Sequence, residues 1–201
     1  MNWLRLAVVL LGMGNAALAL ELPATFDVKD VAAGDVLNVR ETPAADAGIV
    51  GKIGPFDQNV EILELSTDGK WGKVGIPEGN GWVAMRYLDL NAPSDPQMIP
   101  RPISCYGTEP FWSLSLRPGV AEYNSPETGA VVLAITTERV GNNGYLLQVE
   151  EGPTLIRTMI VARQSCNDGM SDRQFGFSAI MFVDSPEGNG LHRGCCTLDG
   201  R

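Results

Sequence analysis

The segment 165–174, SCNDGMSDRQ, gathers several side chains that could do chemistry. The thiol of Cys166 is followed closely by the carboxylates of Asp168 and Asp172. Three interpretations fit this order of residue types: a nucleophile with acidic helpers, a metal-binding loop, or a turn held by a disulfide. The choice among them depends on the histidines and cysteines elsewhere in the chain, and on the elements that must position the segment.

Catalysis by Cys166 would need a general base, which is usually a histidine. The chain has one histidine, His192, which lies three residues before Cys195. A cysteine that is bonded to another cysteine cannot attack a substrate. A triad of Ser171, His192 and an aspartate is formally available, but no nucleophile-elbow sequence surrounds the serine. The sequence therefore predicts that the protein is not an enzyme and that it uses no cofactor.

A metal-binding loop fits the segment less well than a turn does. A calcium loop places carboxylates at alternating positions and ends with a glutamate, whereas NDGMSD lacks that register. A zinc site would need CxxC-type spacing or several histidines, and the chain has neither. We therefore expect no metal. Asn167-Asp168-Gly169 is strong turn chemistry, because an aspartate there accepts backbone hydrogen bonds within its own turn.

Residues 1–19 have the layout of a secretory signal peptide. One positive charge in MNWLR precedes an apolar run without acids or bases, and Ala17-Leu18-Ala19 is a small-x-small cleavage site. The apolar run of about 14 residues is short for the ~20 that a membrane-spanning helix needs. We therefore expect cleavage before Leu20, no membrane span in the mature chain, and a periplasmic or secreted protein.

All four cysteines lie in the second half of the chain. An even number in an exported protein favours disulfides over free thiols. Cys195 and Cys196 are adjacent, and a bond between neighbours fits disulfide geometry badly. Cys166 is therefore expected to pair with one of these two residues and Cys105 with the other.

The chain of 201 residues carries a formal net charge of −9 and has a pI of about 4.6. Binding to nucleic-acid phosphates depends on lysine and arginine, so this charge argues against a nucleic-acid partner. The negative charge also argues against a basic surface that binds anionic lipid. It is compatible with a protein kept dispersed by charge repulsion.

The proline-rich segment NAPSDPQMIPRP, residues 91–102, is the clearest boundary in the chain. Such segments act as extended, semi-rigid linkers. The composition changes there too, because all four lysines precede it and all four cysteines follow it. Short alternating apolar runs separated by glycine and asparagine turns predict strands on both sides. We predict an all-β protein with domains at residues 20–90 and 103–201.

The first domain resembles the bacterial SH3-like domain found in many exported proteins. The resemblance covers about residues 24–90 and rests on the order of LNVR, GKI, a tryptophan-containing strand, GWV and a closing YL. It implies a small, strongly bent β-barrel. It also implies binding, often to cell-wall peptide or to another protein, since the fold itself has no intrinsic chemistry. The loop AADAG after Pro43 departs from the family, whose loop is richer in serine.

The candidate ligand contacts in this domain are five polar or aromatic residues: Asn38, Arg40, Trp71, Trp82 and Tyr87. Each also has a purely structural interpretation. The sequence favours a core position for both tryptophans. Arg40 would pair with an acidic neighbour, and Tyr87 would close the barrel.

Residues 103–198 resemble a family of small, mostly uncharacterised envelope domains. The shared marks are the Gly-x-Glu-Pro-Phe-Trp segment at 107–112, the Cys-x-Asp-Gly-Met-Ser segment at 166–171, and the Gly-Cys pair at 194–195. The resemblance implies a disulfide-stapled β-barrel or β-sandwich. It favours the pair Cys166–Cys195, with the additional Cys105 and Cys196 bonded to each other.

Three acidic residues are candidates for a binding surface on this second domain: Glu109, Asp168 and Asp172. Glu109 stands beside a proline and two aromatic residues, which would suit a ligand carboxylate in an apolar cleft. We favour the alternative, in which Glu109 pairs with an arginine while Phe111 and Trp112 fill the core.

The sequence therefore predicts a non-catalytic, exported binding protein of the bacterial cell envelope. Its expected partner is cell-wall peptide or an envelope protein, recognised through the first domain. One alternative is an inhibitor of a lysozyme-like enzyme, in which the acidic loop around Asp168 and Asp172 plugs a basic cleft. Another is an envelope hydrolase that depends on His192.

Overall fold

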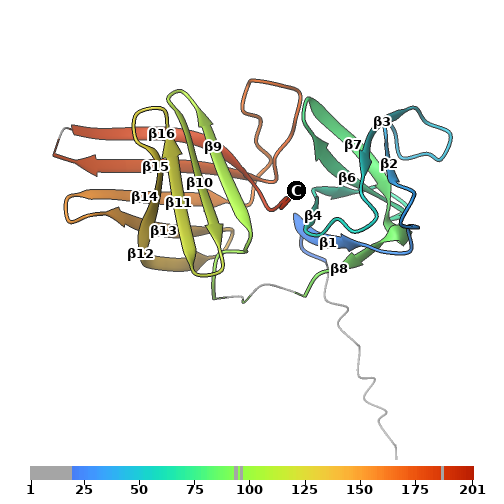
Figure 1. Cartoon of the computed structure of the whole chain (residues 1–201), viewed down its shortest axis with the longest axis horizontal. Coiled ribbons are helices and arrows are strands. Elements are labelled where there is room, and N and C mark those ends of the chain that lie inside the picture. Colours follow the sequence, from blue (N-terminus) through green and yellow to red (C-terminus); the bar gives the residue numbers. More distant parts are fainter. Residues whose placement is uncertain (1–19, 93–94, 96, 187) are drawn as a thin grey trace, which may run out of the picture.

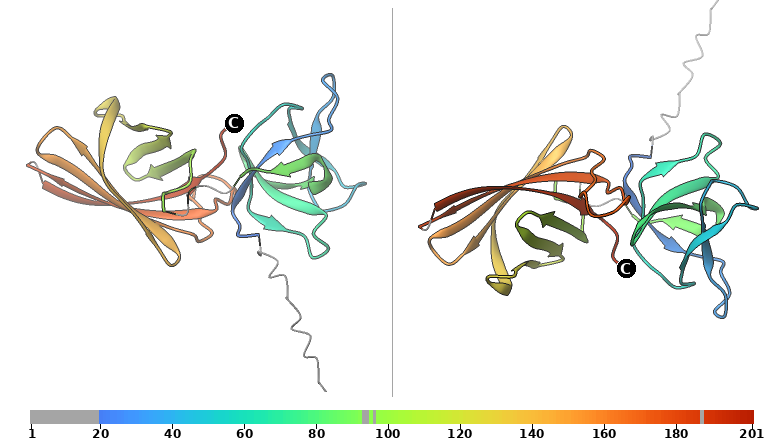
Figure 2. Two further views of the ribbon diagram at one scale, coloured as in Figure 1. Left: turned by 90° about the horizontal axis from the view of Figure 1, so that it is seen from below. Right: turned by 90° about the horizontal axis from the view of Figure 1, so that it is seen from above.

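The computed structural model describes residues 20–92, 95, 97–186 and 188–201 of the chain. The predicted signal peptide at residues 1–19 lies outside the described residues. The described chain forms two β units that lie side by side, and its C-terminal residues run into the space between them (Figure 1 and Figure 2). The regular elements described are strands and one short 3-10 turn, which confirms the all-β prediction.

The N-terminal unit contains a five-stranded sheet with the order β3-β2-β7-β6-β5 and a three-stranded sheet with the order β4-β1-β8. Every strand pair in the two sheets is antiparallel. The elements are β1 (Ala24–Val28), β2 (Leu37–Arg40), β3 (Ile49–Ile53), β4 (Val60–Ile62), β5 (Glu64–Leu65), β6 (Trp71–Ile76), β7 (Gly79–Ala84), the 3-10 turn η1 (Met85–Tyr87) and β8 (Leu88–Leu90).

Alternation along the strands decides which residues form the core of this unit. In β2, Leu37 and Val39 are buried, whereas Asn38 and Arg40 are partly exposed. Successive side chains of a strand point to opposite faces of the sheet. The buried residues of both sheets pack into one cluster, so the outer face of the five-stranded sheet is left to the polar and aromatic residues between them.

The C-terminal unit is a closed antiparallel barrel in which each strand pairs with the next and β16 returns to β9. Closure removes the free sheet edges that invite pairing with other chains. The prediction of a second β domain is confirmed, and its form is a barrel. The strands are β9 (Ile103–Thr108), β10 (Phe111–Arg117), β11 (Val120–Ser125), β12 (Gly129–Gly141), β13 (Gly144–Glu151), β14 (Leu155–Ala162), β15 (Phe177–Ser185) and β16 (Gly188–Thr197).

Two glycines make room for the buried Trp112 in the barrel. A Cβ atom on Gly107 of β9 would lie 2.0 Å from Trp112 Nε1, and one on Gly194 of β16 would lie 2.8 Å from Trp112 Cζ2. Trp112 is only 3% exposed and belongs to the barrel core. The glycines of the Gly-x-Glu-Pro-Phe-Trp and Gly-Cys motifs therefore have a packing role.

Two disulfides hold the strand that closes the barrel. Cys105 of β9 is bonded to Cys196 of β16, and Cys166 is bonded to Cys195. These are the pairs that the family resemblance favoured. Cys105 and Cys196 lie directly opposite each other in the β9–β16 ladder. The side chain of Cys195 points to the other face of β16. The two adjacent cysteines therefore form their disulfides on opposite faces of the barrel wall.

The proline-rich connection between the units ends on the barrel. Ile99 is 1% exposed and belongs to the barrel core. Arg101 donates from Nη1 and Nη2 to the two carboxylate oxygens of Glu138 at 2.9 and 2.7 Å. The last part of the segment predicted as a linker is therefore attached to the second unit.

Candidate ligand-binding face

One cross-strand row crosses the whole outer face of the five-stranded sheet. Each of its members lies directly opposite the next on the neighbouring strand, and adjacent strands are about 4.8 Å apart. The row places an indole ring between two cationic side chains. We call it the Trp82 row, and its members in order from β3 to β5 are Ile49, Arg40, Trp82, Lys73 and Glu64.

Both tryptophans of this unit lie outside its core. Trp71 and Trp82 are partly exposed, and neither belongs to the core cluster. The sequence favoured a core position for them. Their strand neighbours Val74 and Val83 are fully buried, and the alternation that buries these valines turns the tryptophans outward. Trp71 shares a face with Lys73, because the two residues are separated by one position on β6.

The other predicted contacts of this domain occupy two different environments. Asn38 lies on the same face as Arg40, two positions earlier on β2. Arg40 donates from Nη1 to the carbonyl oxygen of Ala47 at 2.6 Å, whereas the sequence had suggested an acidic partner. Tyr87 lies in η1 and packs against the core cluster. Four of the five predicted contacts therefore share one face, and Tyr87 belongs to a separate element.

The outer face is basic on a chain that is acidic as a whole. Arg40 and Lys73 flank Trp82, and Lys52 is exposed on the neighbouring strand β3. The acidic member of the row is Glu64, whose Oε2 lies 3.6 Å from Lys73 Nζ. An aromatic ring offers a flat apolar platform, and the flanking cations suit carboxylates. This arrangement fits a ligand that combines planar groups with negative charge.

The segment 165–174 is a loop whose two ends are joined to each other by hydrogen bonds. Cys166 and Phe175 exchange two backbone hydrogen bonds, of 3.0 and 2.8 Å. The disulfide from Cys166 to Cys195 fixes this base to β16. Because Cys166 is held in this bond, it has no thiolate with which to attack a substrate.

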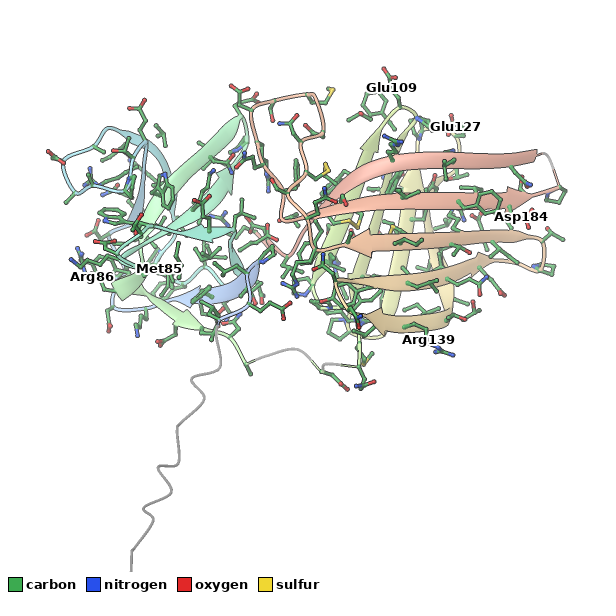
Figure 3. All side chains as sticks on the ribbon, turned by 180° about the vertical axis from the view of Figure 1, so that it is seen from behind. Met85, Arg86, Glu109, Glu127, Arg139 and Asp184 are labelled. Atoms are coloured by element: carbon green, nitrogen blue, oxygen red, sulfur yellow. A yellow bond between two sulfur atoms is a disulfide. The ribbon has the colours of Figure 1, made fainter. Side chains whose placement is uncertain are left out.

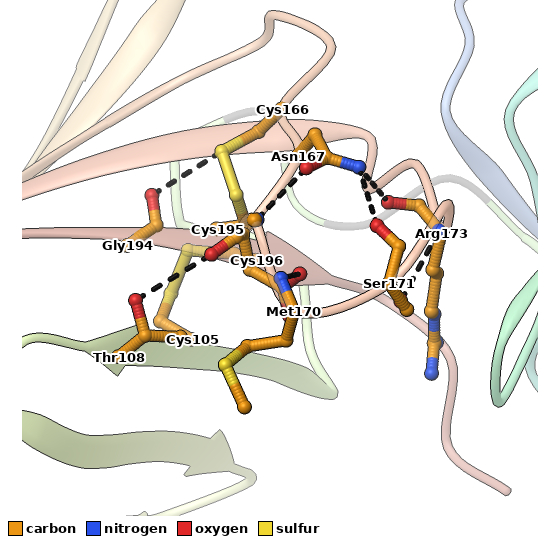
Figure 4. Close-up of a disulfide and its surroundings, with 12 residues drawn as sticks. Cys105, Thr108, Cys166, Asn167, Met170, Ser171, Arg173, Gly194, Cys195 and Cys196 are labelled. Carbon is orange, nitrogen blue, oxygen red and sulfur yellow. Dashed lines mark hydrogen bonds between the residues drawn. A yellow bond between two sulfur atoms is a disulfide. The ribbon is translucent and has the colours of Figure 1, made fainter.

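The side chain of Asn167 stabilises the loop through hydrogen bonds to the loop backbone. Its Nδ2 donates to the carbonyl oxygens of Ser171 and Arg173 at 2.9 and 3.0 Å (Figure 4). Asp168 Oδ1 accepts a hydrogen bond from the backbone nitrogen of Met170 at 3.0 Å. Asp168 thus makes the local turn bond that its sequence context suggested.

The predicted acidic surface residues of the barrel lie on two segments that touch, because Thr108, next to Glu109, donates from Oγ1 to the Asp168 carbonyl oxygen at 3.5 Å. Glu109 is exposed at the turn between β9 and β10 (Figure 3), and it forms no ion pair with any residue that the structure describes. Phe111 is 57% exposed, whereas Trp112 is buried, because neighbouring residues of β10 point to opposite faces. Asp172 is exposed on the 165–174 loop.

Glu61 of β4 is buried where the two units meet. It is 3% exposed, and both of its oxygens bind the C-terminal unit. Oε2 accepts from Thr197 Oγ1 at 2.5 Å, and Oε1 accepts from the backbone nitrogen of Leu198 at 2.9 Å. Burial raises the pKa of Glu61 to about 7, with a contribution from Asp199, while the two hydrogen bonds and Arg173 act in the opposite direction.

The 165–174 loop makes a second contact with the N-terminal unit. The backbone nitrogen of Gln174 donates to Asn80 Oδ1 at 2.8 Å, and Lys73 Nζ donates to Gln174 Oε1 at 2.7 Å. The Arg173 guanidinium packs against Gly75, where an added Cβ atom would lie 2.9 Å from Nε. The loop therefore reaches the Trp82 row at Lys73.

Sequence reasoning missed Glu61, Lys73 and Gln174. Glu61 carried a signal, because it is an acidic residue inside the apolar run Val60–Ile62, all of which is buried. Lys73 and Gln174 carried none. They are 101 residues apart, and only the packing of the two units brings them together.

Two kinds of feature are absent from the residues that the structure describes. No group of three or more His, Cys, Asp or Glu side chains is placed there to hold a metal ion. Nor does that part of the chain contain a helix with the length and apolar character needed to cross a membrane.

Comparison with known proteins identifies part of the first unit. No curated protein and no solved structure matches the chain. The family model for the bacterial SH3 domain matches residues 35–89, a range that contains every member of the Trp82 row. Residues 35–89 of this chain therefore form a bacterial SH3 domain, as the sequence resemblance indicated.

Proposed function

We propose that this protein binds the peptide part of the bacterial cell wall through the outer face of its SH3 domain. The observation that carries the proposal is the Trp82 row, in which Trp82 lies between Arg40 and Lys73. Domains of this family commonly bind peptidoglycan. A peptide presents planar amide groups and at least one carboxylate, which are the groups that an indole ring and two cations recognise.

We expect the aromatic residue of the row to contribute more binding energy than the two cations. Exposed ion pairs contribute little, typically 0–1 kcal/mol, so Arg40 and Lys73 would mainly orient a carboxylate. Partly buried aromatic side chains dominate many binding interfaces. Trp82 is therefore the residue whose removal is expected to cost most, and Asn38 and Trp71 extend the same face.

This function also requires an exported protein. We place the mature chain, starting at Leu20, in the periplasm or outside the cell, as a non-catalytic protein with domains at 20–90 and 103–201. Both disulfides support an oxidising compartment, because such bonds persist in exported proteins and are rare in the cytosol.

The test is co-sedimentation of the full mature chain, residues 20–201, with purified peptidoglycan. We expect the wild-type chain to pellet and Trp82→Ala to raise its apparent Kd by about tenfold or more. The control is Phe56→Ala, which removes an aromatic side chain that is 73% exposed elsewhere in the same domain. Peptidoglycan stripped of its peptides by an amidase should no longer bind.

Two results would contradict this function. If the wild-type chain stays in the supernatant, the wall is not its partner. If Trp82→Ala pellets as well as Phe56→Ala does, the wall is bound by some other surface.

A second candidate function rests on the exposed tip of the 165–174 loop. Met170 is 65% exposed and Asp172 is exposed on a loop that a disulfide holds rigid. Such a loop has the form of a plug for the basic cleft of a lysozyme-like enzyme. This function predicts salt-sensitive inhibition of a lysozyme, and the double variant Asp168→Asn, Asp172→Asn should lose it.

A further inference from the structure

Hydrogen bonds and a disulfide hold the 165–174 loop in a fixed position against the SH3 domain. Its base is closed by the Cys166–Phe175 hydrogen bonds and by the disulfide to Cys195. The Asn167 side chain also binds the returning arm of the loop, at the carbonyl oxygens of Ser171 and Arg173. A loop with this many internal restraints loses little further conformational freedom when it binds something, which favours affinity.

The loop meets the Trp82 row at a defined point. Lys73 Nζ is shared between Gln174 Oε1, at 2.7 Å, and Glu64 Oε2, at 3.6 Å. The backbone of Gln174 is fixed to Asn80 by a hydrogen bond of 2.8 Å. The loop therefore stands at the end of the row, beside the cation that flanks Trp82.

A pocket of about 210 Å³ opens directly beyond this point, between the two units. Glu64 of the row and Gln174 of the loop both line it. Leu63 contributes from the SH3 side, and Arg163 and Phe175 contribute from the barrel side. Glu64 belongs to both features, and Gln174, which lines the pocket, accepts a hydrogen bond from Lys73 of the row, so the row and the pocket form one continuous surface.

We propose that this surface is a single peptide-binding site to which both domains contribute, with Gln174 as the residue that the barrel supplies. The inference rests on the proposed function of the Trp82 row. The ligand is an acidic wall peptide that lies over Trp82, directs a carboxylate to Lys73 and places its next small side chain in the pocket. The barrel domain then has a role in recognition through the loop that its disulfide holds in place.

The chemistry of Gln174 suits this role. A glutamine amide has one acceptor oxygen and two N–H donors. The oxygen is occupied by Lys73, whereas within the described part of the chain Nε2 donates no hydrogen bond, and the side chain is exposed. Nε2 is therefore placed to donate to a carbonyl or carboxylate oxygen of a peptide. Lys73 keeps donors for the same ligand, because an ammonium group has three.

The experiment compares variants of the full mature chain in co-sedimentation with purified peptidoglycan. Gln174→Glu is the informative change. It keeps an acceptor for Lys73, so the contact between the domains is retained, but it removes the Nε2 donor and adds a negative charge that repels an acidic peptide. We expect a rise of about tenfold in the apparent Kd for Gln174→Glu and of about fivefold for Gln174→Ala, as for loss of one hydrogen bond.

The matched control, Gln58→Ala, changes an exposed glutamine of the first unit and should bind as the wild type does.

The outcomes separate this inference from the function on which it rests. If Trp82→Ala loses binding but Gln174→Glu and Gln174→Ala bind as the wild type does, the SH3 domain binds alone and the shared site is refuted. If Gln174→Ala weakens binding but Gln174→Glu does not, the role of Gln174 is to hold the domains together, and the shared site is again refuted. If the wild-type chain does not pellet, the proposed function itself fails.

Discussion

At the scale of single residues, Glu61 has the most unusual environment among the described carboxylates. Its ordinary pKa of 4.5 rises to about 7 because burial disfavours the charged form. Between these two values the folded protein keeps a proton that the unfolded chain has released. Stability therefore falls as the pH rises through this range, since the folded state binds the additional proton. The contribution is fully present below about pH 4.5 and is lost above about pH 7.

The variant Glu61→Gln should remove this pH dependence. Glutamine keeps the shape and one acceptor oxygen but cannot ionise. Relative to the wild type, we expect equal stability near pH 4 and a gain of about 3 kcal/mol near pH 8, because each unit of pKa shift corresponds to about 1.4 kcal/mol. Urea unfolding followed by tryptophan fluorescence at several pH values measures the difference.

Glu78→Gln is the matched control, since Glu78 is exposed on the turn after β6. Its stability should follow that of the wild type across the whole pH range. Parallel curves for Glu61→Gln and the wild type would show that Glu61 does not carry the extra proton.

At the scale of elements, the barrel depends on how closely β9 and β16 approach Trp112. Strand alternation explains the position of the buried indole on β10, but its fit depends on the missing side chains of Gly107 and Gly194. Protein cores are packed densely enough that one added methyl group is felt. The strands here are also held by the Cys105–Cys196 disulfide, so they have little freedom to move apart.

We expect Gly107→Ala to destabilise the protein by about 3 kcal/mol, at the upper end of what overpacking costs. The new Cβ atom would lie 2.0 Å from Trp112 Nε1, and the indole or the strand must shift. Thermal unfolding followed by near-ultraviolet circular dichroism would report both the lower Tm and the altered indole environment.

Gly141→Ala provides the comparison within the same barrel. A Cβ atom at Gly141 would meet its nearest neighbour, the Gly144 carbonyl oxygen, at 3.5 Å, which is an ordinary contact. Its Tm should remain close to that of the wild type. A similar Tm for Gly107→Ala would mean that Trp112 adjusts without cost.

At the scale of the whole molecule, the SH3 domain and the barrel are held together by a closely packed contact. Gly176 lies in this contact, where an added Cβ atom would be 2.1 Å from Pro23 Cγ and 3.1 Å from Glu61 Oε1. Arg163 donates to the Pro23 carbonyl oxygen at 3.0 Å beside it. A larger side chain at Gly176 should therefore separate the units without affecting either core.

Gly176→Val tests this contact. We expect the radius of gyration from small-angle X-ray scattering to increase, while far-ultraviolet circular dichroism keeps the wild-type strand signal. Gly79→Val, at a position where a Cβ atom would meet nothing within 4 Å, should leave the radius of gyration unchanged. An unchanged radius for Gly176→Val would show that the contact tolerates the added volume.

Much of the local structure could be predicted from the sequence, because its signals are local. The alternation in LNVR predicted a strand, the Asn167-Asp168-Gly169 run predicted a turn, and the order of short motifs indicated the SH3 domain. The number of disulfides followed from an even count of cysteines in a chain with export features. Four of the five predicted ligand contacts share one face for the same reason, since alternation on β2, β6 and β7 orients their side chains.

The sequence by itself therefore determined an all-β chain, its SH3 domain and the turn at Asn167-Asp168-Gly169, because the signals for each lie in short stretches of neighbouring residues. Only the tertiary structure decided that Trp82 lies between Arg40 and Lys73, because strand register sets those neighbours. Only the packing of the two units decided that Glu61 is buried and that Gln174 reaches Lys73. These contacts join residues more than 100 positions apart, and no local pattern records which distant surfaces will meet.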